Sequence, residues 1–199
     1  MVFIMCVSRL FGSVSRYGRL FVVGRSALLG SGFASCRFAF AGPRRGLRPD
    51  SVTWLRRQVS ALGPEHVVVS GLAVGADTIV HRSALERGIP QVAVLPSGFD
   101  NVYPRSNLQL ARDIVEAGGC LVSLLPPSAR PSRSSFVARN EVIAELGRML
   151  VVPQFEARSG TRHTVDFAQQ MNKFIVVQST DASGNQLIIN SGAYKTIEK

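Results

Sequence analysis

The chain has 199 residues, 46% of them hydrophobic, which is enough for one sizeable core and too few for two full domains with linkers. Its three cysteines are far apart, and none of its three histidines has a His or Cys neighbour at ligand spacing. The sequence therefore argues against a disulfide framework and a metal site, and we expect a cytoplasmic protein without a cofactor.

The net charge of +10 is concentrated at the N-terminus. Residues 1–49 contain eight arginines and no acidic residue, whereas residues 50–199 contain the other 15 Lys and Arg and all 13 Asp and Glu. A nucleic-acid site in the second part must then be a local patch of arginines.

Residues 1–36 mix apolar patches with arginine, serine and glycine. We expect a basic, poorly ordered extension here, or an over-long start, with a transit peptide as the alternative. No apolar run approaches the roughly 20 residues that a membrane-spanning helix needs, so we expect no membrane partner.

Residues 37–199 are predicted to form one core domain in which strands and helices alternate. Short apolar runs typical of buried strands lie at residues 37–41, 67–70, 91–95, 120–124, 149–152 and 173–177. Stretches with helical spacing lie at residues 51–62, 76–87, 105–117, 137–146 and 161–171. This order predicts a Rossmann-like α/β fold with three αβα layers and a mostly parallel sheet, with ligands bound beyond the carboxyl ends of the strands.

The first two strands are followed by turns rich in small residues. The turn from Ala41 to Gly46 is expected to place Arg44 and Arg45 at the rim of the sheet. The segment from Ser70 to Asp77 contains glycines that let the backbone approach a ligand, and its helix start favours an anion. An ordinary βα turn capped by Asp77 explains that segment equally well.

The third and fourth strands continue the pattern. Ser97 and Gly98 begin a segment in which Phe99 and Tyr103 either stack on bases or fill space under the loop, and for Tyr103 we favour filling. Residues 126–135 are predicted to be a loop. Arg139 and Asn140 are expected in the first turn of the next helix, where a cation opposes the helix dipole and a bound phosphate would compensate.

After the fifth strand, Ser159-Gly160-Thr161 repeats the turn of small residues before a helix. Several such turns at one edge of the sheet would form one phosphate-lined pocket.

These motifs, in this order and spacing, resemble the DprA/Smf family of DNA-processing proteins. The motifs are Ala41 to Arg44, Ser70 to Asp77, His81, Ser97 to Asn107, Phe136 to Asn140 and Ser159 to Thr161. The tail from Gly184 to Ala193 is similar to the segment that closes the core of that family, so the resemblance covers about residues 37 to 195.

The resemblance implies a binding protein and not an enzyme. It would bind and protect single-stranded DNA, help to load a RecA-type recombinase during natural transformation, and form a homodimer. It also implies that Arg44 contacts the DNA backbone and that Arg139 and Asn140 line the same groove. The residues that would offer donors to phosphate are Ser70, Gly71, Ser97, Gly98, Ser159 and Gly160.

The chain departs from the family pattern at four positions. Pro43 stands where the family usually has serine, Pro96 where glycine is common, Gln154 where an acidic residue is usual, and Glu141 where a second arginine is usual. The loss of that second arginine is expected to lower the affinity for DNA.

Two other functions remain open. A nucleotide-binding sensor would use the same class of fold. A nucleotide phosphoribohydrolase would need a Pro-Gly-Gly turn with a catalytic glutamate, whereas here Ser159 to His163 stands in that place and no acidic residue follows before Asp166. His81, one helical turn after Asp77, is expected to lock its turn through a buried hydrogen bond, so its loss should cost stability more than DNA binding.

Overall fold

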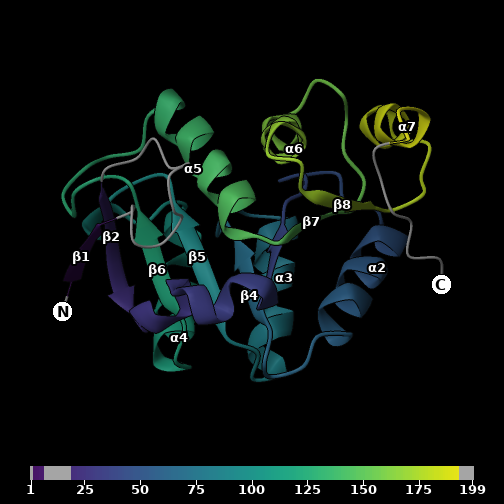
Figure 1. The fold of residues 1–199 in the computed structure, drawn as a ribbon. Coiled ribbons are helices and arrows are strands. Elements are labelled where there is room, and N and C mark those ends of the chain that lie inside the picture. Colours follow the sequence, from purple (N-terminus) through teal and green to yellow (C-terminus); the bar gives the residue numbers. More distant parts are fainter. Residues whose placement is uncertain (1, 7–18, 193–199) are drawn as a thin grey trace.

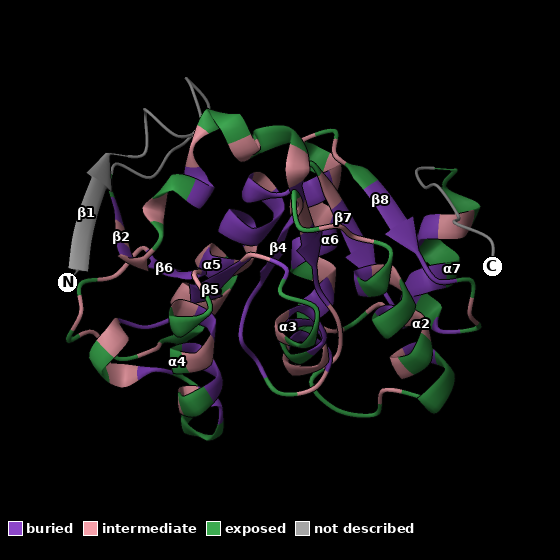
Figure 2. Cartoon of the chain, turned by 90° about the horizontal axis from the view of Figure 1, so that it is seen from below, coloured by how far each residue is buried: buried purple, intermediate pink, exposed green. Residues whose placement is uncertain are grey.

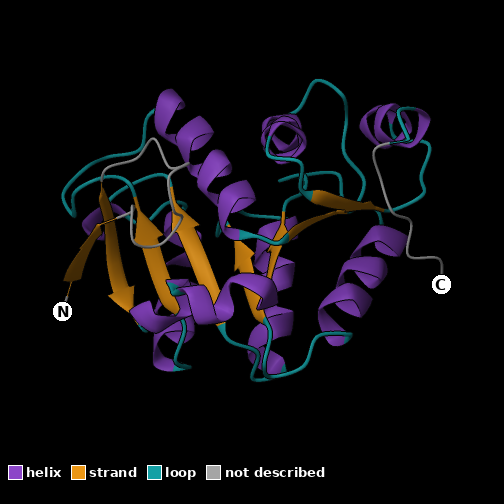
Figure 3. Cartoon of the chain, viewed as in Figure 1, coloured by secondary structure: helices purple, strands orange, loops and turns teal. Residues whose placement is uncertain are grey.

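An eight-stranded sheet runs through the computed structural model, which describes residues 2–6 and 19–192 (Figures 1 and 3). Its strand order is β1-β2-β6-β5-β4-β3-β7-β8. The first two strands, β1 (Val2–Cys6) and β2 (Arg19–Gly24), run antiparallel to their neighbours. The parallel strands are β3 (Arg37–Phe40), β4 (Val67–Ser70), β5 (Gln91–Leu95), β6 (Cys120–Ser123), β7 (Met149–Val152) and β8 (Phe174–Val177).

Helices cover both faces of the sheet, which gives three layers (Figure 1). One face carries α2 (Pro49–Ser60), α3 (Ala76–Glu86) and α4 (Leu108–Glu116). The other carries α5 (Arg133–Leu146), α6 (Gly160–Gln170) and α7 (Ser183–Asn190). Four 3₁₀ segments complete the described chain: η2 (Ser26–Leu29), η3 (Ser31–Cys36), η4 (Phe99–Asn101) and η5 (Arg105–Asn107).

The central strands are buried on both sides, as Figure 2 shows by colour. In β4 the side chains of Val67 and Val69 enter the core beneath α5 and α6, whereas Val68 enters the core beneath α2 and α3. Burying a valine side chain stabilises a fold by about 1.5–3 kcal/mol, so a strand covered on both faces favours valine at every position. The predicted α/β class with a mostly parallel sheet is confirmed, and each of the six predicted strands is present.

The expected boundary between an extension and the core at residues 36 and 37 does not match the fold. Strand β2 pairs with β6, and the side chains of Leu20, Val22, Leu28 and Leu29 are buried in the core. Residues 19–36 therefore belong to the core domain, and the charged residues Arg19 and Arg25 concealed this by flanking a short apolar run. Residues 7–18 of the expected extension lie outside the described residues.

The order of the strands creates a switch point between β3 and β7. From β3 the chain moves outward through β4, β5 and β6, and then returns to place β7 on the opposite side of β3. In open α/β sheets, ligands bind in the crevice beyond the carboxyl ends of the strands at such a point.

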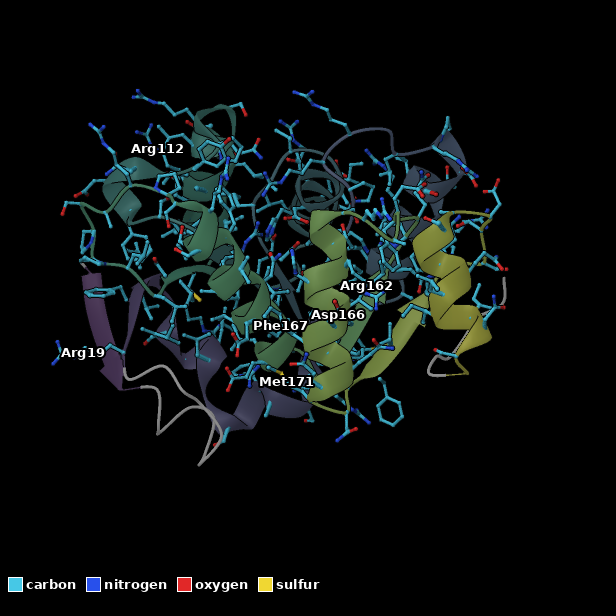
Figure 4. All side chains as sticks on the ribbon, turned by 90° about the horizontal axis from the view of Figure 1, so that it is seen from above. Arg19, Arg112, Arg162, Asp166, Phe167 and Met171 are labelled. Atoms are coloured by element: carbon cyan, nitrogen blue, oxygen red, sulfur yellow. The ribbon has the colours of Figure 1, made fainter. Side chains whose placement is uncertain are left out.

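Helix α5 is fixed at its C-terminal end by two cations. Arg37, which is buried, donates from Nε to Leu146 O at 2.9 Å, and Lys173 donates from Nζ to Gly147 O at 2.8 Å. Positive charge at a helix C-terminus is stabilising, although burial lowers the pKa of both side chains. Figure 4 shows α6 lying beside α5, with Phe167 and Met171 on the side that faces α5.

Candidate nucleic-acid interface

A cavity of about 470 Å³ opens at the switch point, between the loop after β3 and the helices α5 and α6. We call it the larger cavity. Its wall brings together five of the nine predicted site residues: Arg44, Arg139, Asn140, Ser159 and Gly160. A volume of this size is typical of sites for small ligands or single nucleotides.

Arg44 lies at the tip of a loop with fixed ends. Ala41 donates from N to Val151 O at 3.2 Å, and Pro43 O accepts from Ala76 N at 3.1 Å. Gly75 has φ of +81°, and a Cβ there would lie 2.5 Å from Pro43 O, so only glycine lets the two loops pack this closely. The loop is therefore held rigidly while the side chain of Arg44 stays exposed.

Two aromatic rings stand beside Arg44. Its guanidinium carbon lies 4.8 Å from the ring centroid of Phe136, and the rings of Phe136 and Tyr103 meet edge to face with centroids 5.4 Å apart. Tyr103 is 43% exposed, so the prediction that it fills space under its loop is wrong. Phe136 is half-buried. Accessible aromatic rings next to an arginine are the groups that stack on nucleobases in single-stranded DNA sites.

A smaller cavity of about 380 Å³ lies on the other side of Arg44 and Phe136. Its wall includes Gly71, Tyr103 and Arg45, and it shares Arg44, Phe136 and Arg139 with the larger cavity. The two cavities therefore meet at one cluster of arginine and aromatic side chains.

Arg139 lies beneath this cluster and is buried, with 5% of its surface exposed. Its Nη1 lies 3.4 Å from Asp77 Oδ2, and its Nε has no hydrogen-bond partner among the described residues. The expected position in the first turn of α5 is wrong, because the helix begins four residues earlier, at Arg133. There Ser132 and Ser135 form a reciprocal capping box, so residues 133–135 are helical and not part of the predicted loop.

Gly71 provides the space that Arg139 occupies. A Cβ at Gly71 would lie 1.2 Å from Arg139 Nη1 and 2.9 Å from Asp77 Oδ2. Asp77 also accepts from Ala73 N at 3.2 Å, whereas the N-cap of α3 is Gly75. The alternative in which Asp77 caps this helix is therefore wrong, and the carboxylate instead holds the loop and the buried arginine.

The electrostatics of the cluster favour an anion. Burial lowers the pKa of Arg139, the carboxylate of Asp77 opposes that shift, and the nearby guanidinium of Arg44 adds to it. The buried carboxylate pairs with Arg139, and the charge of Arg44 remains close enough to repel that of Arg139. A phosphate in the larger cavity would relieve the repulsion between them.

The N-terminus of α6 forms the opposite wall. Ser159 is its N-cap but makes no side-chain capping bond, and no partner for its buried Oγ is found in residues 2–6 and 19–192. Asn140 donates from Nδ2 to Gly160 O at 3.3 Å, which joins α5 to this helix. Free backbone amides at a helix N-terminus are suited to binding a phosphate.

Ser70, Ser97 and Gly98 line neither cavity. Ser70 Oγ donates to Phe40 O at 2.9 Å, Ser97 Oγ donates to Asn101 O at 2.7 Å, and Gly98 N donates to Ala129 O at 2.9 Å. Their predicted role as donors to phosphate does not fit these contacts, because each donor already serves to hold a loop.

The sequence analysis missed Phe136 and Arg133 as members of the larger cavity. With Val137, Asn140 and Ile143 they form one face of α5 at helical spacing, and all of them line the cavity. The signal was the capping residue Ser132, which sets the correct start of the helix. Glu141, the departure expected to weaken DNA binding, is buried and does not line the cavity.

His81 is buried on α3, and its ring meets Gln91 with 2.8 Å between Nδ1 and the side-chain amide. With the amide nitrogen of Gln91 directed at Nδ1, the amide oxygen also accepts from Leu85 N at 3.2 Å, so Nδ1 is an acceptor and the ring is neutral. A buried hydrogen bond is present as expected, but its partner is Gln91 and it does not lock the turn before α3. It joins α3 to β5.

Burial lowers the pKa of His81, against the opposing effects of Gln91 and Asp77. As the pH falls below about 6.5, the imidazole of His81 therefore takes up a proton in the unfolded chain before it does so in the folded protein. The free energy of unfolding then decreases by up to about 1.4 kcal/mol per pH unit.

We expect His81→Gln to be less stable than the unsubstituted protein at pH 7.5 but to lose less further stability between pH 7 and 5.5. Melting temperatures from pH 8 to 5 test this, with the exposed His163→Gln as control; an unchanged acid loss in His81→Gln would contradict it.

The described ranges contain no group of three or more His, Cys, Asp or Glu placed to hold a metal ion. Among the helices of the described chain, none has the length and apolar content required to cross a membrane.

The fold and site define a Rossmann-like domain with an arginine-lined cavity at its switch point. The sequence matches the family model of DNA recombination-mediator protein A over residues 20–199, and the chain belongs to this family. Protein Smf of Synechocystis is 36% identical over 146 residues, which is 70% of this chain and 36% of that protein. The chain thus spans about a third of the length of this relative.

Two solved structures share the fold. DNA processing protein A of Helicobacter pylori superimposes with a TM-score of 0.83 at 24% identity, over 100% of this chain and 92% of that one. DNA processing protein A of Streptococcus pneumoniae gives a TM-score of 0.80 at 28% identity, over 91% of this chain and 63% of that one.

Proposed function

We propose that this chain binds single-stranded DNA at the two cavities beside Arg44 and acts as a DNA recombination mediator, not as an enzyme. The observation that carries the proposal is the exposed guanidinium of Arg44 stacked on Phe136, at the mouth of a cavity whose far wall is an uncapped helix N-terminus. Membership of the recombination-mediator family and the single-stranded DNA binding of the Helicobacter pylori protein support it.

In this proposal each group has a separate task. Arg44 pairs with a backbone phosphate, and the amides of Ser159 and Gly160 with the side chain of Asn140 hold a phosphate at the start of α6. Phe136 and Tyr103 stack on bases, a contact worth about 1–3 kcal/mol per base. Arg139 supports the site from below. The further expectations of a RecA-type recombinase partner, a homodimer and a cytoplasmic location are part of the same proposal.

The size of the larger cavity favours a small nucleotide as the second candidate ligand. The two functions differ in what competes for the site. A nucleotide sensor would be stabilised more by a mononucleotide than by an oligonucleotide, whereas a DNA-binding site gains from every additional phosphate.

The test is fluorescence anisotropy of the full chain with a labelled single-stranded oligonucleotide in a salt series. We expect binding with a slope of log affinity against log salt of about −0.7 for each neutralised phosphate. An excess of deoxynucleoside monophosphate should compete only weakly. Strong competition by the monophosphate with no binding of the oligonucleotide would favour the nucleotide sensor.

A further inference from the structure

Gln154 lies two residues beyond the end of β7 and is buried, with 8% of its surface exposed. Its Oε1 accepts from Arg48 N at 2.8 Å and from Ser51 Oγ at 3.0 Å, and its Nε2 donates to Gly46 O at 3.1 Å. All three partners belong to the segment that runs from the Arg44 loop into α2. One side chain therefore holds this segment at three points.

The main chain around Gln154 is itself fixed. Asn185 on α7 is fully buried; it donates from Nδ2 to Pro153 O at 2.9 Å and accepts from Phe155 N at 2.8 Å. Both neighbours of Gln154 are thus fixed to α7. The amide is presented from a rigid support and not from a mobile loop.

Helix α2 depends on this amide at its start. Its N-cap residue, Arg48, makes no side-chain capping bond, and the backbone N–H of Arg48 donates to the side chain of Gln154. An amide combines an acceptor and a donor, and both are used here. The family usually has an acidic residue at this position. A carboxylate accepts hydrogen bonds but does not donate them, so one of its oxygens would face Gly46 O without a hydrogen between them.

Gln154 also connects the two walls of the larger cavity. It lies at the start of the segment that leads to Ser159 and Gly160, and it holds the loop that presents Arg44. From these contacts we infer that Gln154 is a positioning residue, which sets the separation between Arg44 and the N-terminus of α6. This inference rests on the proposed function, because its consequence is the affinity for DNA.

The test is the substitution Gln154→Glu, which keeps size and shape. At pH 8 the introduced carboxylate loses the donor to Gly46 O and repels it, so the Arg44 loop is released at its Gly46 end and affinity for single-stranded DNA falls by roughly tenfold. As the pH falls, protonation of the introduced carboxyl restores a donor and affinity returns toward that of the unsubstituted protein. The charged side chains in this region are those of Arg48 and of the acidic residues around it, Asp50, Glu156 and Asp181, and all four are exposed.

Gln178→Glu is the control, since Gln178 is likewise a buried glutamine just beyond the carboxyl end of a strand, here the neighbouring strand β8. Among the described residues, no hydrogen bond of Gln178 reaches the Arg44 loop, so the affinity of Gln178→Glu should stay within about twofold of that of the unsubstituted protein, without the pH dependence. If Gln154→Glu at pH 8 binds DNA as tightly as the control does, the positioning role is refuted.

Hydrogen–deuterium exchange of the peptide that contains residues 42–48 separates this inference from the proposed function. Exchange in Gln154→Glu, relative to the unsubstituted protein at the same pH, should be faster at pH 8 and approach equality at acid pH. If the unsubstituted protein binds no DNA but this exchange pattern holds, the proposed function is refuted, while the role of Gln154 in holding the Arg44 loop is supported. If exchange in Gln154→Glu equals that of the unsubstituted protein at every pH, Gln154 does not hold the loop.

Discussion

Replacing Arg44 with alanine is expected to weaken the binding of single-stranded DNA by about 10- to 100-fold. A hydrogen bond to a charged group contributes about 1.5–3 kcal/mol, and each 1.4 kcal/mol is a factor of ten in affinity. The slope of log affinity against log salt should become shallower by about 0.7, because one phosphate contact is lost. Fluorescence anisotropy in a salt series measures both quantities.

The fold should tolerate this change. Arg44 is exposed, and its stacking on Phe136 contributes about 0.5–1 kcal/mol at such a site, so the melting temperature should fall by no more than about 4 °C. Arg44→Lys keeps the charge but loses the planar fork and the stacking, and should bind with intermediate affinity.

The matched control is Arg112→Ala, which removes one exposed positive charge from α4, on the opposite side of the sheet from α5 and α6 (Figure 1). If both alanine variants lose the same affinity, binding depends on net charge alone, and the assignment of the site to the switch point is wrong.

The parallel part of the sheet could be predicted because a strand that is buried on both faces appears in the sequence as a continuous apolar run. Four consecutive residues of β4 are buried, and the first three, Val67 to Val69, form an apolar run bounded by His66 and by Ser70 and Gly71. Strand β2 leaves a weaker mark, because only Leu20 and Val22 are buried and they alternate with less buried residues. An antiparallel strand near the edge of a sheet gives this pattern, and it was obscured by the neighbouring arginines.

The location of the site could be predicted from the sequence, but many of the contacts of its side chains could not. Turns of small residues at the strand ends located Arg44, Ser159 and Gly160 correctly around one cavity. The depth of Arg139 was not predictable from the spacing alone, since an error of four residues in the start of α5 places a side chain about 6 Å, or one turn, too close to the N-terminus of the helix. A hydroxyl group such as that of Ser70 can donate to the main chain of a loop as readily as to a ligand, and the sequence does not distinguish these two roles.

Arg139→Ala is expected to destabilise the protein by about 3–5 kcal/mol, because it leaves the carboxylate of Asp77 buried without its cation. The melting temperature should fall by roughly 10 °C. DNA affinity, measured well below the transition, should fall less than in Arg44→Ala, since Arg139 supports the site from below and is not exposed at its surface. A large loss of affinity at unchanged stability would instead make Arg139 a direct contact.

Gly71→Ala tests the ion pair between Arg139 and Asp77 without removing a charge. The added methyl group would occupy the position of Arg139 Nη1, so the guanidinium must leave Asp77 and stability should fall by several kcal/mol. In the Arg139→Ala background most of that cost should disappear, which gives a coupling between the two sites of about 1–3 kcal/mol in a double-mutant cycle. Gly32→Ala is the control, because a Cβ there meets nothing within 4 Å. Additive losses in the cycle would show that the cost of the methyl group comes from a neighbour other than Arg139, such as Asp77 Oδ2, and not from the space that Gly71 leaves to the buried arginine.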